Sequence, residues 1–342
     1  MSRPSPRISS ASLLDEVRVS CAAVASRARH VTIEQRALAP YAASLPLGAL
    51  AAPSIDPRFH VLADEASTVA YFLTLDTINF GSGYFPAMRK RPGLSGYFTV
   101  ALSLKEAFER EGVWSAAQLA AMTPAHCAAV FGQDADFPPM ELFATALRDL
   151  GALLLADYDG RPAALVEAAG ASAERLVRLL AAMPYYRDVA DYDGLAVAFY
   201  KRAQLAAADL ALALSPSPAG DGAAGVTERG SAGSGLARFG DLDRLTIFAD
   251  NLVPHVLRVD GVLRYAPELL ARIDAGVQIP SGSPEEIELR ACAVHAVELL
   301  KAEVNRRGGA VTSSQLDYFL WNRGQAPAYK ALPRHRTRSV YY

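Results

Sequence analysis

The sequence predicts a mainly α-helical protein built as a single domain. Apolar residues recur three and four positions apart through most of the 342 residues, which is the period of an amphipathic helix. Hydrophobic residues make up 51% of the chain and charged residues 20%, so a large core is expected and bulk disorder is excluded. Only short runs such as 195–200 have the composition of a strand.

The expected helices are bounded by capping residues and by proline. The first one carries an apolar stripe that includes Leu13, Val17 and Cys21. Ser115 and Ser172 precede later helices as N-caps. Helices are expected within residues 12–29, 62–75, 94–110, 115–130, 138–155, 173–183, 199–214 and 283–301.

The clearest helix start is a capping box, Ser283-Pro284-Glu285-Glu286. We expect the Ser283 hydroxyl to accept a hydrogen bond from the amide of Glu286, and the Glu286 carboxylate to reach back to the amide of Ser283. Proline suits the first helical position because it has no amide to leave unsatisfied there. The apolar spacing then carries this helix to about Lys301.

One change in composition decides the domain organisation. Residues 215–235 are rich in serine, proline, glycine and alanine and have no apolar period. Such a segment can divide two domains, but the helical patterns on both sides favour a flexible loop inside one domain. We therefore expect a disordered N-terminus at 1–11, a single domain at 12–325 and a C-terminal tail at 326–342.

Charge and cysteine content limit the partners and the compartment. The chain carries 34 Lys and Arg against 36 Asp and Glu, and this balance disfavours nucleic acid or an anionic membrane as the main partner. Cys21, Cys127 and Cys292 are too far apart to suggest a disulfide framework, and they fit a reducing cytoplasm. No apolar stretch approaches the roughly 20 residues that cross a bilayer, and no secretory signal is recognisable.

Sequence motifs for metals and cofactors are missing. The six histidines form no HExxH or HxH pattern and no cluster with cysteine, so no metal is expected. Neither GxSxG, nor a P-loop, nor a strand-to-helix GxGxxG occurs, and no cofactor is expected. Gly81-Ser82-Gly83 is a short glycine-rich turn that is too weak by itself to indicate a phosphate site.

Two segments in the first two thirds of the chain combine polar groups with apolar helices. Asp76 and Asn79 lie three residues apart, beside aromatic residues, at the end of a helix, where either can be a local cap. Lys201 and Arg202 lie at the start of the helix at 199–214. They form either a solvated face or a clamp for an anionic group, in which lysine is a point charge and arginine a planar fork.

A third segment, 245–254, holds the single carboxylate Asp250 among apolar residues. Burial of an unpaired carboxylate is costly, so this side chain has to be paired, hydrogen-bonded or shifted in pKa. The alternative is a helix-terminal aspartate that prepares the turn before Pro254.

The fourth segment is a short aromatic helix at 316–322. Asp317 and Trp321 share one helix face, and Tyr318 and Asn322 share the adjacent one. Aromatic rings with amide and carboxylate neighbours suit a planar heterocycle that is both stacked and hydrogen-bonded. A C-terminal core helix with a polar edge explains the pattern equally well.

Five segments, taken together and in order, resemble the queuosine salvage protein family of queuosine 5′-phosphate N-glycosylases. The longest is LTIFADNLVPHVLRVDGVLRYAPELLARIDAGVQIPSGSPEEIELRACAVHAVELL, and LDYFLWN follows it. The others are VRVSCAAVASRARHVTI, LDTINF and FYKRAQLAAADL. The resemblance covers roughly residues 12–325.

This resemblance implies hydrolysis of the N-glycosidic bond of queuosine 5′-phosphate, which releases the 7-deazaguanine base queuine. It implies a helical fold similar to that of helix-hairpin-helix DNA glycosylases, and it places the catalytic carboxylate at Asp250. The contacts to the base that it implies are Asp250 itself, His30, Phe248, Asp317, Tyr318 and Asn322. The sequence departs from the family pattern at Gly81-Ser82-Gly83 and at Asn322, where many relatives have an acidic side chain.

The implied chemistry agrees with the residues. Cleavage of an N-glycosidic bond builds positive charge on the ribose C1′, which the carboxylate of Asp250 stabilises while it orients or deprotonates water. Queuine carries a cationic secondary amine, for which Asp317 is a suitable partner. The residues expected to hold the 5′-phosphate or to line the pocket are Lys201, Arg202, Asn79 and Asp76.

Two other functions remain open at this point. One is a protein that binds queuine or its nucleoside without turnover, and the other is a glycosylase that acts on nucleic acid. The acidic balance speaks against the second. The preferred partner is therefore a small molecule, queuosine 5′-phosphate or queuosine, with no stable nucleic-acid or membrane partner, and the queuine released would serve tRNA modification.

Overall fold

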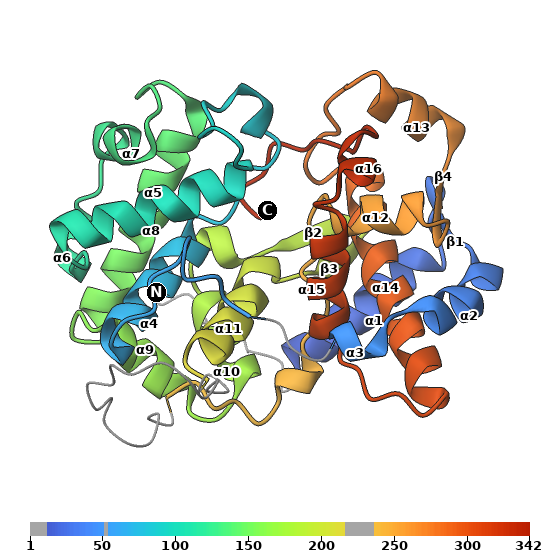
Figure 1. Cartoon of the computed structure of the whole chain (residues 1–342), viewed down its shortest axis with the longest axis horizontal. Coiled ribbons are helices and arrows are strands. Elements are labelled where there is room, and N and C mark those ends of the chain that lie inside the picture. The colour runs from blue at the N-terminus through green and yellow to red at the C-terminus, as the bar shows by residue number, and fades with distance from the viewer. Residues whose placement is uncertain (1–11, 51–53, 216–235) are drawn as a thin grey trace, which may run out of the picture.

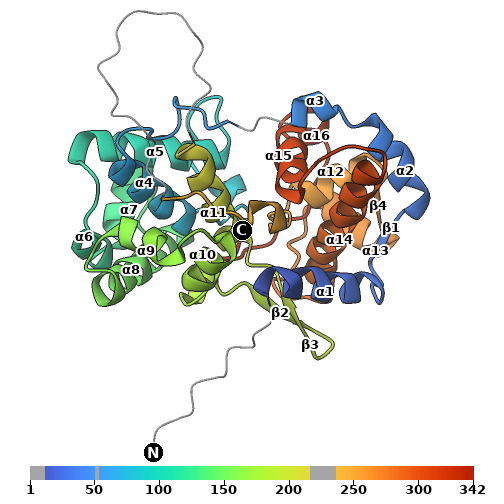
Figure 2. The same cartoon turned by 90° about the horizontal axis from the view of Figure 1, so that it is seen from below.

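The computed structural model describes residues 12–50, 54–215 and 236–342, and it is mainly helical, as the sequence predicts (Figure 1). The disorder expected at 1–11 and nearly all of the loop expected at 215–235 lie outside these residues. The helices form two groups, one from the middle of the chain and one from its two ends (Figures 1 and 2).

The group from the middle of the chain is all helix apart from irregular connections. Its helices are α4 (Glu65–Thr77), α5 (Gly96–Glu111), α6 (Ala116–Ala120), α7 (Pro124–Phe131), α8 (Pro138–Asp157), α9 (Pro162–Ala169), α10 (Ala173–Leu180) and α11 (Lys201–Ala213). The side chains of Ser115 and Ser172 cap α6 and α10, as expected. The segment 115–130 holds two helices, because a turn at 121–123 separates α6 from α7.

The second group brings the two ends of the chain together. Its helices are α1 (Leu13–Ala25), α2 (Gln35–Ser44), α3 (Leu47–Leu50), α12 (Val253–Val259), α13 (Pro267–Asp274), α14 (Pro284–Arg306), α15 (Ser313–Arg323) and α16 (Pro327–Lys330). The long α14 packs against α1, α2, α12 and α15, so it is the central helix of this group. One cluster of buried apolar side chains extends through both groups.

Among the described residues, one short antiparallel ladder joins distant segments and a second one is a local hairpin. β1 (Val31–Ile33) pairs with β4 (Leu263–Tyr265), and β2 (Val189–Tyr192) pairs with β3 (Leu195–Ala198). The sequence predicts only the last of these, within 195–200. Strands of three or four residues contain too few positions for an alternating pattern to stand out.

The capping box at the start of α14 is half right. The Ser283 hydroxyl accepts from the amide of Glu286 at 3.3 Å, as expected. The Glu286 carboxylate accepts instead from the amide of Gly282 at 3.1 Å, because the amide of Ser283 bonds to the carbonyl of Pro280. The helix then continues past Lys301 and ends at Arg306.

The sequence predicts a C-terminal tail at 326–342. In the structure, the residues after α16 make specific contacts with the rest of the molecule. The Tyr342 carbonyl accepts from the amide of Gly81 at 2.9 Å, and its hydroxyl donates to Glu286 at 2.8 Å. At Gly83 an added Cβ would lie 2.1 Å from the carbonyl oxygen of Thr337, so only glycine allows the chain to approach so closely. The segment therefore crosses from one group of helices to the other.

No helix in the described part of the chain has both the length and the apolar character that a membrane crossing requires.

Candidate active site

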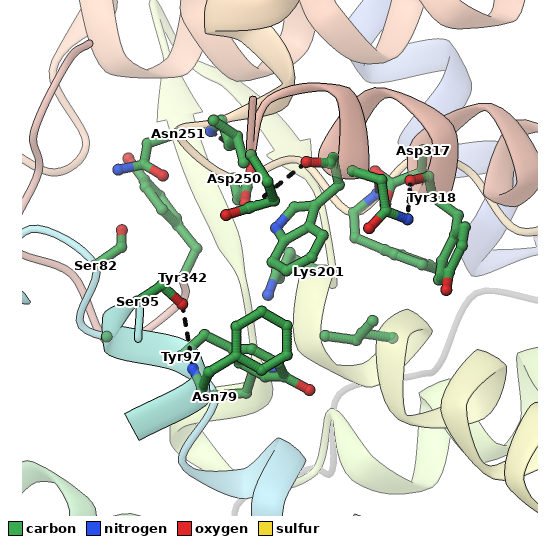
Figure 3. A pocket seen from close by; sticks show the side chains of 18 of the residues that line it. Asn79, Ser82, Ser95, Tyr97, Lys201, Asp250, Asn251, Asp317, Tyr318 and Tyr342 are labelled. Carbon is green, nitrogen blue, oxygen red and sulfur yellow. Dashed lines mark hydrogen bonds between the residues drawn. The ribbon is translucent and has the colours of Figure 1, made fainter. Parts of the chain in front are cut away.

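A cavity of about 1130 Å³ lies between the two groups of helices. Its walls come from α11 and from residues 79–98 on one side, and from residues 242–252, α15 and the C-terminal segment on the other. It is much larger than a water site and slightly exceeds the usual range of small-molecule pockets, about 300–1,000 Å³. Figure 3 shows part of this lining, with Asn79, Lys201, Asp250, Asp317 and Tyr318 among the labelled side chains.

Asp250 lines this cavity just before α12. Its Oδ1 accepts hydrogen bonds from the amides of Leu252 at 2.7 Å and Val253 at 3.0 Å. Pro254 lies in the first turn of α12, so it begins a helix rather than ending one. Among the described residues, no hydrogen bond or ion pair engages Oδ2 of Asp250, which leaves one carboxylate oxygen available to a bound molecule.

A buried ion pair anchors the backbone on which Asp250 lies. The guanidinium of Arg290, on α14, makes two hydrogen bonds to Asp188, at 3.0 and 2.6 Å, and donates from Nε to the carbonyl of Ala249 at 3.0 Å. Asp188 also accepts from the amide of Lys201 at 3.1 Å. One buried arginine–aspartate pair thus ties Asp250 and Lys201 to the central helix.

Lys201 is 7% exposed and extends into the cavity from the first position of α11 (Figure 3). The preceding residue, Tyr200, has a φ of 48°, a left-handed conformation that is unfavourable for a non-glycine residue. Burial lowers the pKa of Lys201, and the negative charges of Asp250 and Asp76 act in the opposite direction. Within the described residues its ammonium group has no hydrogen-bond or ion-pair partner, so its charge is offset only through space, by acidic residues such as Asp250.

The α15 residues behave as their helical spacing predicts. Asp317 and Trp321 both line the cavity, and so do Tyr318 and Asn322 on the adjacent face. Asp317 is 5% exposed, and its Oδ1 accepts from the amide of Phe248 at 2.9 Å. Burial, and then the negative charge of Asp250, raise the pKa of Asp317 well above its usual value.

Aromatic rings provide the flat part of the cavity wall. Phe248 and Tyr97 line it together with Trp321, and the Tyr97 and Trp321 ring centroids lie 5.9 Å apart at 81°. The Tyr97 hydroxyl is within 2.9 Å of Nε2 of His60, which fixes the tyrosine side chain. The cavity thus combines rings for stacking with carboxylate and amide groups for hydrogen bonding.

Two acidic residues, Asp209 and Asp76, belong to the α11 side of the cavity: the first lines the cavity and the second is buried behind its wall. Asp209 lines it, and burial raises the pKa of this carboxyl to about 7. Asp76 is fully buried and does not reach the cavity, and no hydrogen bond from the part of the chain that the structure describes engages its carboxylate. Burial, followed by the charge of Asp209, raises the pKa of Asp76 well above its usual value. Asn79, three residues later, does line the cavity.

The structure does not bring His30 or Arg202 to the cavity. The amide of His30 donates to Glu288 Oε2 at 2.6 Å, and that oxygen also accepts from the amides of the residues before and after it. The Arg202 guanidinium is 1% exposed and donates to the carbonyls of Asp76, Thr77 and Tyr185. Neither residue lines this cavity: the contacts of His30 are those of its backbone amide, whereas those of Arg202 engage its guanidinium.

The sequence-based assignment leaves out many of the polar residues that line the cavity, Asp209 among them, and five of these also line a smaller pocket beside Asp250. They come from the glycine-rich turn, the segment after it, the position next to Asp250 and the C-terminal segment: Ser82, Lys90, Asn251, Arg334 and Arg336. The signal for the arginines was the alternation in Arg334-His335-Arg336-Thr337, where the buried His335 and Thr337 put both arginines on the opposite face of an extended chain. No group of three or more potential metal ligands occurs among the residues that the structure describes.

Comparisons with known proteins show the family of this chain. The family model described as queuosine salvage protein matches residues 59–342. A queuosine 5′-phosphate N-glycosylase/hydrolase from Sphaerobacter thermophilus is 36% identical over 93% of this chain and 95% of its own. Proteins with the same name from Mus musculus and Dictyostelium discoideum are 31% and 33% identical, over 95% and 80% of this chain and 98% and 78% of their own. The chain therefore belongs to the queuosine salvage protein family.

Proposed function

We propose that this protein hydrolyses the N-glycosidic bond of queuosine 5′-phosphate, the substrate in the names of its relatives. The observation that carries the proposal is the Asp250 carboxylate. Two backbone amides hold one of its oxygens in place, and the other is open to a cavity of nucleotide size. A fixed carboxylate is the group that stabilises a cationic C1′.

In the proposed reaction the C1′–N bond breaks and its electron pair leaves with the base. Positive charge develops on C1′ and the ring oxygen, and Asp250 stabilises it. A water oxygen then bonds to C1′, and one proton of that water ends on the base. Asp250 is also the group that orients this water, since its Oδ1 is already occupied by backbone amides and Oδ2 is not.

We assign the end of the cavity that binds the base to α15 and to the irregular segment that contains Phe248. Asp317 offers a carboxyl oxygen to the polar edge of the base, while its other oxygen stays with the amide of Phe248. Phe248, Tyr318 and Asn322 complete this end, in agreement with the sequence-based assignment. Lys201 lies near Asp250 and Asp317, so its proposed role is to balance their charges and not to hold a phosphate.

The proposal includes the setting of the reaction. The substrate is a free nucleotide in the cytoplasm, and the three buried cysteines, which carry free thiols, are consistent with a reducing compartment. A likeness to helix-hairpin-helix DNA glycosylases is also part of it, and superposition of an experimental structure on such an enzyme tests that likeness. A stable nucleic-acid complex is not expected from the charge balance.

The test is product analysis. The purified protein is incubated with queuosine 5′-phosphate, and the mixture is separated by chromatography. Release of queuine and ribose 5-phosphate in equal amounts supports the proposal. Tight calorimetric binding without release would identify a binding protein instead, and release of base only from a queuosine-containing RNA would identify a nucleic-acid glycosylase.

A further inference from the structure

The segment that carries Asp250 is held mainly by side chains from other elements. Residues 245–252 belong to no helix or strand, and within the described residues positions 246–251 make no hydrogen bond from backbone to backbone. Three side chains from helices fix their backbone instead: Gln204, Asp317 and Arg290. We propose that Gln204 is a positioning residue that determines where the Asp250 carboxylate lies relative to the Lys201 ammonium, an assignment that rests on the proposed function.

The Gln204 side chain is fully buried, and its amide group bridges two segments of backbone. Its Oε1 accepts a hydrogen bond from the amide of Thr246 at 2.8 Å. Its Nε2 donates to the carbonyl of Phe199 and to the hydroxyl of Thr246, both at 2.9 Å. A backbone amide only donates and a carbonyl only accepts, so these partners decide which atom of the side-chain amide is oxygen. Gln204 therefore replaces the neighbouring strand that this backbone lacks.

The two segments joined by this bridge each lead to a charged group of the cavity. Phe199 lies two residues before Lys201, and Tyr200 between them has the left-handed φ of 48°. Thr246 lies four residues before Asp250. Lys201 and Asp250 extend into the cavity from opposite walls (Figure 3), and among the charged groups Asp250 has the largest effect on the pKa of Lys201. The bridge therefore connects the supports of two groups that interact.

A second link between these segments makes the bridge effective. The buried pair of Arg290 and Asp188 also joins them. One link alone would leave each segment free to pivot about it, and the bridge by Gln204 removes that freedom. Without Gln204, the amide of Thr246 and the carbonyl of Phe199 would be buried without partners, so we expect both segments to shift. A displacement of about 1 Å near the reacting groups can lower a rate about 100-fold.

Gln133 provides a matched control, because it makes the same kind of bridge elsewhere in the molecule. Its Oε1 accepts from the amide of Arg89 at 3.0 Å, and its Nε2 donates to the carbonyls of Arg89 and Phe131, both at 2.8 Å. It is buried and does not line the cavity. Methionine has nearly the length of glutamine but makes none of these bonds. We therefore expect Gln204→Met and Gln133→Met to lower the melting temperature by similar amounts.

The kinetic test measures kcat and KM for queuosine 5′-phosphate well below the melting temperature of each variant. We expect Gln204→Met to lower kcat by about 10- to 100-fold and to change KM little, because Gln204 does not line the cavity. Gln133→Met should keep the wild-type kcat at saturating substrate. Thr246→Ser keeps the hydroxyl that accepts from Gln204 and should retain kcat, whereas Thr246→Val should lower it. Equal losses of kcat in the two methionine variants would indicate a general loss of stability and would overturn the inference.

Amide hydrogen exchange, followed by NMR, tests the positioning without turnover. The amides of Leu252 and Val253 donate to Oδ1 of Asp250, so their exchange rates report whether this carboxylate stays in place. We expect Gln204→Met to speed exchange at both amides and at Thr246, and the control variant to change none of the three. Faster exchange at Thr246 alone would show a local bond that does not affect Asp250, and would overturn the inference. If the wild-type protein releases no base, the proposed function fails, and the exchange rates still decide for or against the positioning role.

Discussion

Replacement of Arg290 by methionine is the most severe test of how the site is held together. The guanidinium is 2% exposed, makes two hydrogen bonds to Asp188, donates to the Ala249 carbonyl, and lies 3.9 Å from the centroid of the Phe199 ring. Arg290→Met leaves the Asp188 carboxylate buried without its cation. Removal of one partner of a buried pair costs about 3–5 kcal/mol, a large part of the stability of an ordinary domain.

The assay is urea denaturation followed by circular dichroism, with Arg272→Met as the control. Arg272 pairs with Glu285 near the surface, where such a pair contributes about 0–1 kcal/mol. We expect Arg290→Met to lose at least 2 kcal/mol more than this control, and the further change Asp188→Asn to restore part of the loss because no charge is then buried alone. Equal stability of the two single variants would refute the view that the buried pair organises the site.

Two further predictions concern a buried acid and a close backbone contact. Burial raises the pKa of Asp209 to about 7, so the folded state binds this proton more tightly than the unfolded state does, and the stability it contributes below pH 4 is lost as the pH rises through 7. Asp209→Asn should therefore match the wild-type melting temperature near pH 4 and exceed it increasingly up to pH 8, whereas a constant difference would contradict the assignment. Gly83→Ala would place a methyl group 2.1 Å from the Thr337 carbonyl, and we expect it to lower the free energy of unfolding, measured by urea denaturation. Gly48→Ala, which meets no atom within 4 Å, is its control, and equal effects of both changes would count against the close contact.

The predictions from the sequence were most successful for features that depend on a short, repeated spacing of residues, such as helices. Helical spacing and N-caps found most of the long helices, and the same spacing placed Asp317 and Trp321 together on the wall of the cavity. These features depend on neighbours within one or two turns, which a single sequence displays directly.

Long-range contacts were beyond sequence reasoning, and they account for the errors. The backbone amide of His30 is bonded to Glu288, more than 250 positions away, and His30 does not line this cavity. Arg202 follows the cavity-lining Lys201 but points away from it, toward carbonyl oxygens of other segments. Adjacent residues on a helix point about 100° apart, so a pair of cations in the sequence need not be a pair in space.

The small pocket next to Asp250 could likewise not be found from the sequence, because its lining residues are far apart in the chain. Ser82, Lys90 and Arg336 are separated by up to 254 positions, and no local pattern joins them. The alternation around Arg336 was visible in the sequence, but its meaning depends on what the extended segment packs against. A charged residue on such a segment becomes informative once its buried neighbours are known.

The most direct measurement of the central claim is the turnover of Asp250→Asn with queuosine 5′-phosphate. Asparagine keeps an oxygen for the amides of Leu252 and Val253, so the local structure should persist and the melting temperature should change little. It removes the negative charge that is proposed to stabilise C1′, so we expect kcat to fall by about 100-fold or more. A folded Asp250→Asn variant that releases queuine at close to the wild-type rate would contradict the account.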